Sequence, residues 1–172
     1  MGLVPDFLLD YIDVTTFWTI LAMMHGLLAV ALLGAITHQA MSVLAPVRAG
    51  ASPGGIVTRF RAVQGAGYAT AVCVLWLVTF IFGAWIYTKY RMYVRLPLET
   101  QQYWKTQGIF ELKEHLAVIG LGLLPIYWYF WKNARNPEYD SARRWLTVVL
   151  AVMVWYMFLV GHIVNNVRGF GS

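Results

Sequence analysis

Three histidines lie inside apolar stretches of the sequence, at positions that should reach similar depths in a membrane. His25 stands about ten residues into the first apolar stretch, which is roughly 12–15 Å at the rise of an α-helix. By the same measure His115 and His162 each lie roughly 9–10 Å from the same membrane surface. An ionisable group at such a depth is costly and faces the interior of a helix bundle. The three positions therefore predict a functional site that several helices share.

A structural interpretation competes with this one at each position. A single histidine in a membrane helix often serves only as a hydrogen-bonding group between helices. Three imidazoles at one level favour the functional interpretation. The fourth histidine, His38, lies roughly 20 Å deeper than His25 and near the opposite surface, where we expect a solvated role.

A b-type haem is the first cofactor that suits these histidines. Neutral imidazoles from two helices ligate haem iron from opposite faces. In an up-down bundle the first and third helices lie on a diagonal, so His25 and His115 are the predicted ligands. His162 is the alternative partner, and Arg168 at the end of the fourth helix would suit the haem propionates.

A copper or iron ion is the second candidate, held by the same three histidines and Glu111. Glu111 and His115 are four residues apart and share a helix face, as ligands do in helical metal sites. Imidazole together with carboxylate suits zinc, iron or copper. The alternative is that Glu111, Lys113 and Glu114 form a charged turn at the membrane surface. Helical geometry predicts that Glu111 faces the bundle and Glu114 faces water or a partner.

The composition shows what must position these residues. The chain has 172 residues, of which 59% are hydrophobic and 12% charged, whereas soluble domains average about 45–50% apolar and about 25% charged. The basic residues flank apolar stretches, where membrane topology and lipid headgroups account for the net charge of +5. The sequence therefore predicts an integral membrane protein in a lipid bilayer and excludes nucleic acid as its partner.

The predicted fold is all-α, an integral membrane four-helix bundle of up-down topology that forms a single domain over residues 1–172. A membrane crossing takes about 20 residues, and the expected helices lie near residues 15–44, 61–88, 108–132 and 143–167. The third must start near Gly108 to be long enough, which carries charged residues against the membrane. Pro125 should kink this helix.

The orientation of the helices follows from the start of the chain. We name the membrane face that holds the amino terminus side A and the opposite face side B. The amino terminus carries three aspartates and no Lys or Arg before Arg48, which favours an outer location. We therefore expect a multi-pass protein of the cell inner membrane with both termini on the periplasmic side.

The arrangement of four helices with His25, His38, His115 and His162 resembles membrane b-type cytochromes of the four-helix kind. These include cytochrome b561-like proteins and the haem-bearing membrane subunits of respiratory enzymes. The resemblance is architectural and covers the whole chain. It departs from two-haem cytochromes, in which two helices each carry a pair of histidines fourteen apart. Here one helix has a pair, thirteen apart, so no second haem is expected.

This resemblance implies electron transfer by one haem b within a larger respiratory or photosynthetic complex. The implied partners are other membrane subunits of a redox complex and a quinone. Two alternatives stay open, a cofactor-free accessory subunit and a membrane protein that binds copper or iron through His and Glu. Whether the chain is an enzyme is left open as well.

Overall fold

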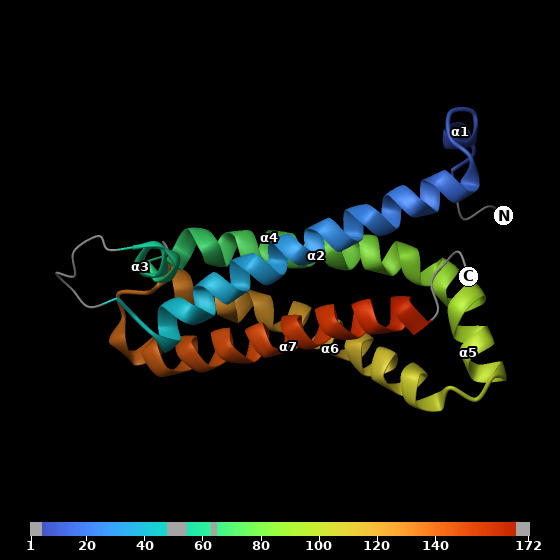
Figure 1. The fold of residues 1–172 in the computed structure, drawn as a ribbon. Coiled ribbons are helices and arrows are strands. Elements are labelled where there is room, and N and C mark those ends of the chain that lie inside the picture. The colour runs from blue at the N-terminus through green and yellow to red at the C-terminus, as the bar shows by residue number, and fades with distance from the viewer. Residues whose placement is uncertain (1–4, 48–54, 63–64, 168–172) are drawn as a thin grey trace.

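The computed structural model describes residues 5–47, 55–62 and 65–167, and helices joined by short turns make up their structure, with no strand among them. Four long helices dominate the fold (Figure 1): α2 (Val14–Leu44), α4 (Gly65–Tyr90), α6 (Trp104–Lys132) and α7 (Asp140–Val167). Short elements connect them: α1 (Asp6–Leu9), α3 (Ile56–Arg61), the π-helical turn η1 (Arg91–Arg95), α5 (Leu96–Thr100) and the 3-10 turn η2 (Pro137–Tyr139).

Length and composition make the chain a multi-pass membrane protein. Three described helical segments are long and apolar enough to cross a bilayer, namely Val14–Leu44, Gly65–Thr100 and Pro137–Asn166. The helix α6 is also long, at 29 residues, but its first half carries Glu111, Lys113 and Glu114. Four membrane helices were expected, and three helical segments of the described residues are long and apolar enough to cross a membrane; α6 is not among them.

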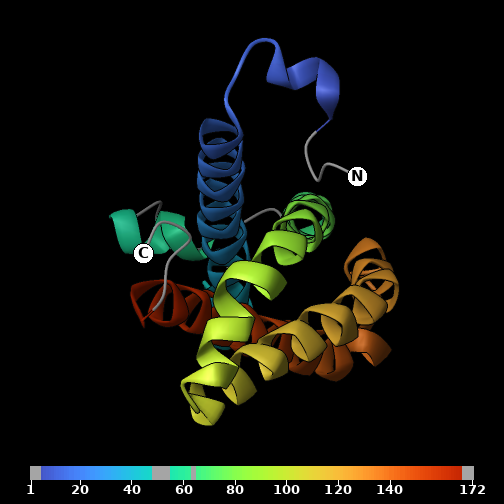
Figure 2. The same ribbon diagram turned by 90° about the vertical axis from the view of Figure 1, so that its right-hand side faces the viewer.

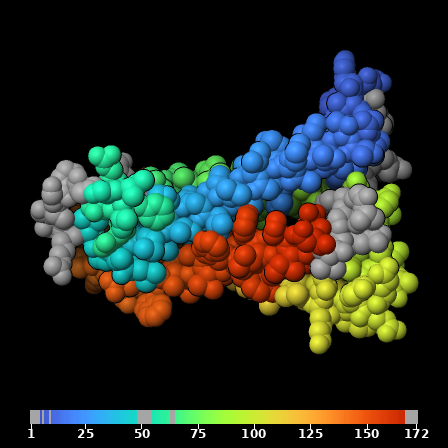
Figure 3. Space-filling model, viewed as in Figure 1, coloured from blue at the N-terminus to red at the C-terminus, as the bar shows by residue number. Residues whose placement is uncertain are grey.

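The four long helices pack in a closed ring. The helix α2 packs against α4 and α7, and α6 packs against the same two helices. Figure 2 shows the ring from the end at which α2 begins and α7 ends. At this end α2 and the first half of α6 diverge from α7, and α1 projects beyond the other helices (Figures 1 and 3). The bundle is therefore tightest at the opposite end.

The apolar core lies where the helices are closest. All four long helices contribute fully buried side chains to it, among them Ile36, Val72, Trp76, Tyr127 and Leu150. The indole of Trp76 lies directly against Gly120 of α6, where a Cβ would be 2.0 Å from a ring atom. Its Nε1 donates a hydrogen bond to the carbonyl of Ala117 at 3.2 Å. A glycine at position 120 is what allows α4 and α6 to approach so closely.

The helix boundaries differ from the expected ones where short elements intervene. Arg61 was expected to begin the second long helix, but it ends α3, and α4 begins at Gly65. The guanidinium of Arg61 donates hydrogen bonds to the carbonyls of Ala45 and Pro46, which ties α3 to the end of α2. The helix α6 begins at Trp104, four residues before the expected start at Gly108.

Candidate functional site

His25 is the one of the three aligned histidines that is packed between helices. Its ring is half-buried against α4, with Nδ1 3.1 Å from the carbonyl oxygen of Thr79. A carbonyl oxygen only accepts hydrogen bonds, so Nδ1 carries a proton, and in the neutral ring Nε2 is the nitrogen with the lone pair. Gly83 lies beneath the ring, because a Cβ there would be 2.9 Å from Cε1 of His25. His25 thus presents a fixed tautomer with a free basic nitrogen.

Lys113 carries its charge from α6 toward α7. Its Nζ lies 4.6 Å from the ring centroid of Phe110, and its Cε is 3.6 Å from where a Cβ of Gly161 would stand. It interacts electrostatically with both His25 and Glu114. No carboxylate of the described residues lies within ion-pair distance of its ammonium group. A π face and nearby dipoles are weaker partners for a cation than a carboxylate.

Glu111 is held by a hydrogen-bonded network at the first turns of α6. Its Oε1 accepts from Nε2 of Gln107 at 3.0 Å and lies 3.3 Å from Nη2 of Arg95. The same Arg95 donates from Nε to Glu99 at 2.7 Å. The hydroxyl of Tyr90 donates to Oε1 of Gln107 at 3.1 Å, and both of these side chains are buried.

These groups together form what we name the polar cluster, which extends from η1 and α5 inward along α6 to α2. Glu114 interacts electrostatically with Lys113, Arg95 and Glu111, and so connects the group around Lys113 and His25 with the group around Arg95 and Glu111. The members of the polar cluster are His25, Tyr90, Arg95, Glu99, Gln107, Glu111, Lys113 and Glu114. A series of ionisable groups that enters an apolar bundle from one end is suited to hold and pass charge.

The other predicted site residues lie elsewhere. The side chains of His115 and His162 are exposed on α6 and α7, and no contact described in the structure brings either to His25. Within the described ranges no group of three His, Cys, Asp or Glu side chains is arranged to hold a metal ion. Arg168 lies outside the described residues. The haem ligand pair and the metal-ligand set remain predictions.

Two further expectations can be compared with the structure. Glu114 was expected to face water or a partner, but it is half-buried, as Glu111 is, and interacts with Lys113. His38 was expected in a solvated position, whereas it is half-buried, and the centroid of its ring lies 3.5 Å from the centroid of the Phe60 ring. Its Nδ1 is 3.0 Å from the carbonyl oxygen of Phe60, so it fastens α3 to α2.

Sequence reasoning missed Tyr90, Arg95 and Gln107, because these residues lie between the helices expected near residues 61–88 and 108–132. The available signals were two pairs with helical spacing, Arg95 with Glu99 and Gln107 with Glu111. Both pairs are four residues apart, which is meaningful only if the segment is helical. The structure makes it helical through the π turn and α5.

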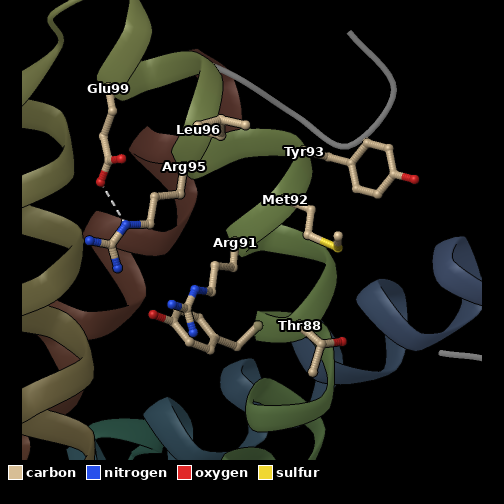
Figure 4. A pocket seen from close by; sticks show the side chains of 8 residues that line it. Thr88, Arg91, Met92, Tyr93, Arg95, Leu96 and Glu99 are labelled. Atoms are coloured by element: carbon tan, nitrogen blue, oxygen red, sulfur yellow. Dashed lines mark hydrogen bonds and ion pairs between the residues drawn. The ribbon is translucent and has the colours of Figure 1, made fainter. Parts of the chain in front are cut away.

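A pocket of about 820 Å³ opens beside the polar cluster at the bend between α4 and α5 (Figure 4). Arg91 and Arg95 project to one side of the bend, whereas Met92 and Tyr93 project to the other. The lining residues are Tyr87, Thr88, Arg91, Met92, Tyr93, Arg95, Leu96 and Glu99.

The fold and the composition define the class of the protein, a helical multi-pass membrane protein with ionisable groups between its helices. No family model, no curated protein and no solved structure matches this chain. The resemblance to b-type cytochromes therefore stays an architectural prediction.

Proposed function

We propose that this chain is a subunit of a membrane complex and passes protons between side A and the bilayer interior through the polar cluster. The observation that carries the proposal is the placement of Lys113. This cation reaches between α6 and α7 toward Phe110 and lacks an ion pair with any described carboxylate. Withdrawing a charge from water costs several kcal/mol in real proteins, so such a residue is retained for function.

The residues divide into groups that exchange protons and groups that hold them in place. The ammonium of Lys113 gives a proton to Nε2 of His25, and the neutral amine that remains takes a proton from a protonated Glu114. Each step moves one proton and breaks no other bond. The flexible four-carbon stem of Lys113 lets its Nζ swing between the two partners.

The hydrogen bond from Nδ1 of His25 to Thr79 keeps Nε2 as the accepting atom. Arg95 and Gln107 keep Glu111 as a fixed acceptor of hydrogen bonds near side A. This fixed negative charge attracts cations, including protons, to the entrance of the cluster.

The proposal requires α6 to cross the membrane as a fourth helix, with its charged half near side A. Four crossings would place both ends of the bundle on one side, as the start of α2 and the end of α7 lie in Figure 1. We propose that this is the periplasmic side of the inner membrane, because the chain has no Lys or Arg before Arg48. A reporter active only in the cytoplasm should work when inserted at Asn136 and be silent at the carboxyl terminus. The reverse pattern would invert the orientation.

A pH jump tests the relay. The protein is reconstituted in liposomes with labelled histidine, and the infrared bands of protonated imidazole are followed after the external pH is changed by stopped flow. Lys113→Met should slow the protonation of His25 by about tenfold or more, which corresponds to at least about 1.4 kcal/mol in the barrier. His25→Gln identifies the band that belongs to His25.

Lys105→Met is the matched control, because Lys105 lies on the same helix and its side chain is exposed. This control should leave the rate unchanged, and Glu114→Gln should slow it as Lys113→Met does. If Lys113→Met and Lys105→Met have equal rates, the cluster is structural and the relay is refuted.

Electron transfer by a haem b bound through His25 is a second candidate function, and the tautomer with the proton on Nδ1 of His25 favours it. With Nδ1 bonded to Thr79, Nε2 is the nitrogen that would ligate iron, and such second-sphere hydrogen bonds are usual for ligating histidines. A haem would supply electron transfer, with a quinone or another redox subunit as the partner. His115 and His162 are exposed, so His25 alone is positioned as an inward ligand in this arrangement.

A reduced-minus-oxidised optical spectrum of the purified chain tests this candidate. Bands of haem b that vanish in His25→Ala and persist in His38→Ala would support it. A spectrum without such bands, together with a normal pH-jump response, would leave the relay as the function of a cofactor-free subunit.

A further inference from the structure

The π-helical turn η1 places two arginines on one side of the chain. Its five residues, Arg91–Arg95, lie between α4 and α5, and π turns are frequent at functional sites. Figure 4 shows the side chains of Arg91 and Arg95 directed to the same side. The widened turn thus concentrates two positive charges at the rim of the pocket.

The two arginines differ in how their charge is balanced. Arg95 lies 2.7 Å from Glu99 and 3.3 Å from Glu111, so two carboxylates surround it. Arg91 is exposed and forms no ion pair with any residue that the structure describes. The guanidinium of Arg91 is therefore available to an anion that enters the pocket.

Apart from the two arginines, Thr88 and Glu99, which pairs with Arg95, the lining of the pocket is apolar or amphipathic. Met92 and Leu96 line it together with Tyr87 and Tyr93, in a volume of about 820 Å³. Tyrosine is enriched at the level of lipid headgroups, where one end of the ring is apolar and the other wet. The pocket also lies near one end of the apolar segment Gly65–Thr100, where a membrane helix would leave the bilayer.

From these observations we infer that the pocket binds a phosphate group through Arg91 and that this phosphate belongs to an anionic phospholipid. A guanidinium forms two parallel hydrogen bonds with phosphate oxygens. Met92 and Leu96 would contact the glycerol and the first methylenes of the acyl chains, a contact that a soluble phosphate cannot make. The pocket adjoins the polar cluster, because Arg95 and Glu99 belong to both, whereas Arg91 lines the pocket and is not part of the polar cluster.

Native mass spectrometry of the full chain in a neutral detergent tests the site, with phosphatidylglycerol, phosphatidylcholine and inorganic phosphate as separate probes. Wild-type protein should retain phosphatidylglycerol in preference to phosphatidylcholine. Arg91→Gln should weaken phosphatidylglycerol binding by about tenfold, the change that loss of one charge-assisted hydrogen bond produces. Arg91→Lys keeps the charge and should retain part of the binding.

Lys105→Gln is the matched control, since Lys105 is an exposed positive residue at the start of α6 that does not line the pocket. It should leave the affinity within about twofold of the wild type, as exposed charges contribute little. Equal losses in Arg91→Gln and Lys105→Gln, or no preference for phosphatidylglycerol, would overturn the inference. Inorganic phosphate bound as tightly as phosphatidylglycerol, and lost in Arg91→Gln, would make the ligand a soluble phosphate and overturn the lipid assignment. Circular dichroism of each variant establishes that it is folded.

Discussion

Replacing Gly120 by Ala should destabilise the protein, although alanine is the better helix former. A methyl group at position 120 would lie 2.0 and 2.4 Å from two ring atoms of Trp76, a side chain that is only 2% exposed and has no free space into which to move. Overpacking of this kind costs about 1–3 kcal/mol. Separation of α4 from α6 would also weaken the bond from Trp76 to Ala117, worth about 1 kcal/mol. The alanine recovers about 1 kcal/mol of helix propensity, so we expect a net loss of about 1–3 kcal/mol.

Gly122→Ala provides the matched control on the same helix. A Cβ at Gly122 has no atom within 4 Å, so this variant should be neutral or more stable by up to about 1 kcal/mol. Reversible unfolding in mixed detergent micelles, followed by circular dichroism, measures both changes. Trp76→Phe combined with Gly120→Ala should recover part of the loss, because the smaller ring leaves room for the methyl group. Equal stabilities of the Gly120→Ala and Gly122→Ala variants would refute the close packing of α4 against α6.

Two pairs of hydrogen-bonded Trp and Thr residues and one helix cap give the remaining predictions. Thr147→Val should lower the free energy of unfolding by about 1–3 kcal/mol in the same assay, because it leaves the indole N–H of Trp131 buried without an acceptor. Thr70→Val, beside the exposed Trp128, should lower it by less than about 0.5 kcal/mol. Equal losses in the two variants would contradict the role of burial. Asp13→Ala should speed amide exchange in the first turn of α2, and Asp13→Asn should not, because it keeps an acceptor oxygen for the amides. Hydrogen bonds from the hydroxyl and the amide of Thr16 hold the pKa of Asp13 below its ordinary value. The stabilising effect of the Asp13 cap should therefore be complete above the unfolded pKa of about 4 and disappear as the pH falls through the lower folded pKa. Exchange rates that do not change with acidification would contradict this capping role.

The positions of the long helices could be predicted because uncharged stretches of sufficient length have few other structures in a membrane. The start of α6 required one further argument, the need for length, and the helix in fact begins still earlier, at Trp104. The segment from Arg91 to Thr100 lies between the helices expected near residues 61–88 and 108–132, where the sequence predicted no helix. It is helical instead, since Pro97 stands in the first turn of α5, where a missing N–H is tolerated.

The candidate site was less predictable, because depth along a helix is readable from sequence while rotation about its axis is not. His25, His115 and His162 were placed at one level by counting residues, but the side chains of His115 and His162 are exposed while that of His25 is half-buried. Lys113, two residues before His115, lies on a different face of α6 and reaches toward α7. Only packing partners such as Gly161 fix that rotation, and a single sequence does not identify them.

The central claim is that His25 exchanges protons with side A through Lys113. Solid-state NMR of the reconstituted chain with ¹⁵N-labelled histidine tests it most directly, when the pH on one face is varied and the other is held constant. We predict that the Nε2 signal of His25 follows the pH of side A, ignores that of side B, and loses its rapid response to side A in Lys113→Met but not in Lys105→Met. A signal that follows side B, or one that responds to side A equally in both variants, would contradict the account.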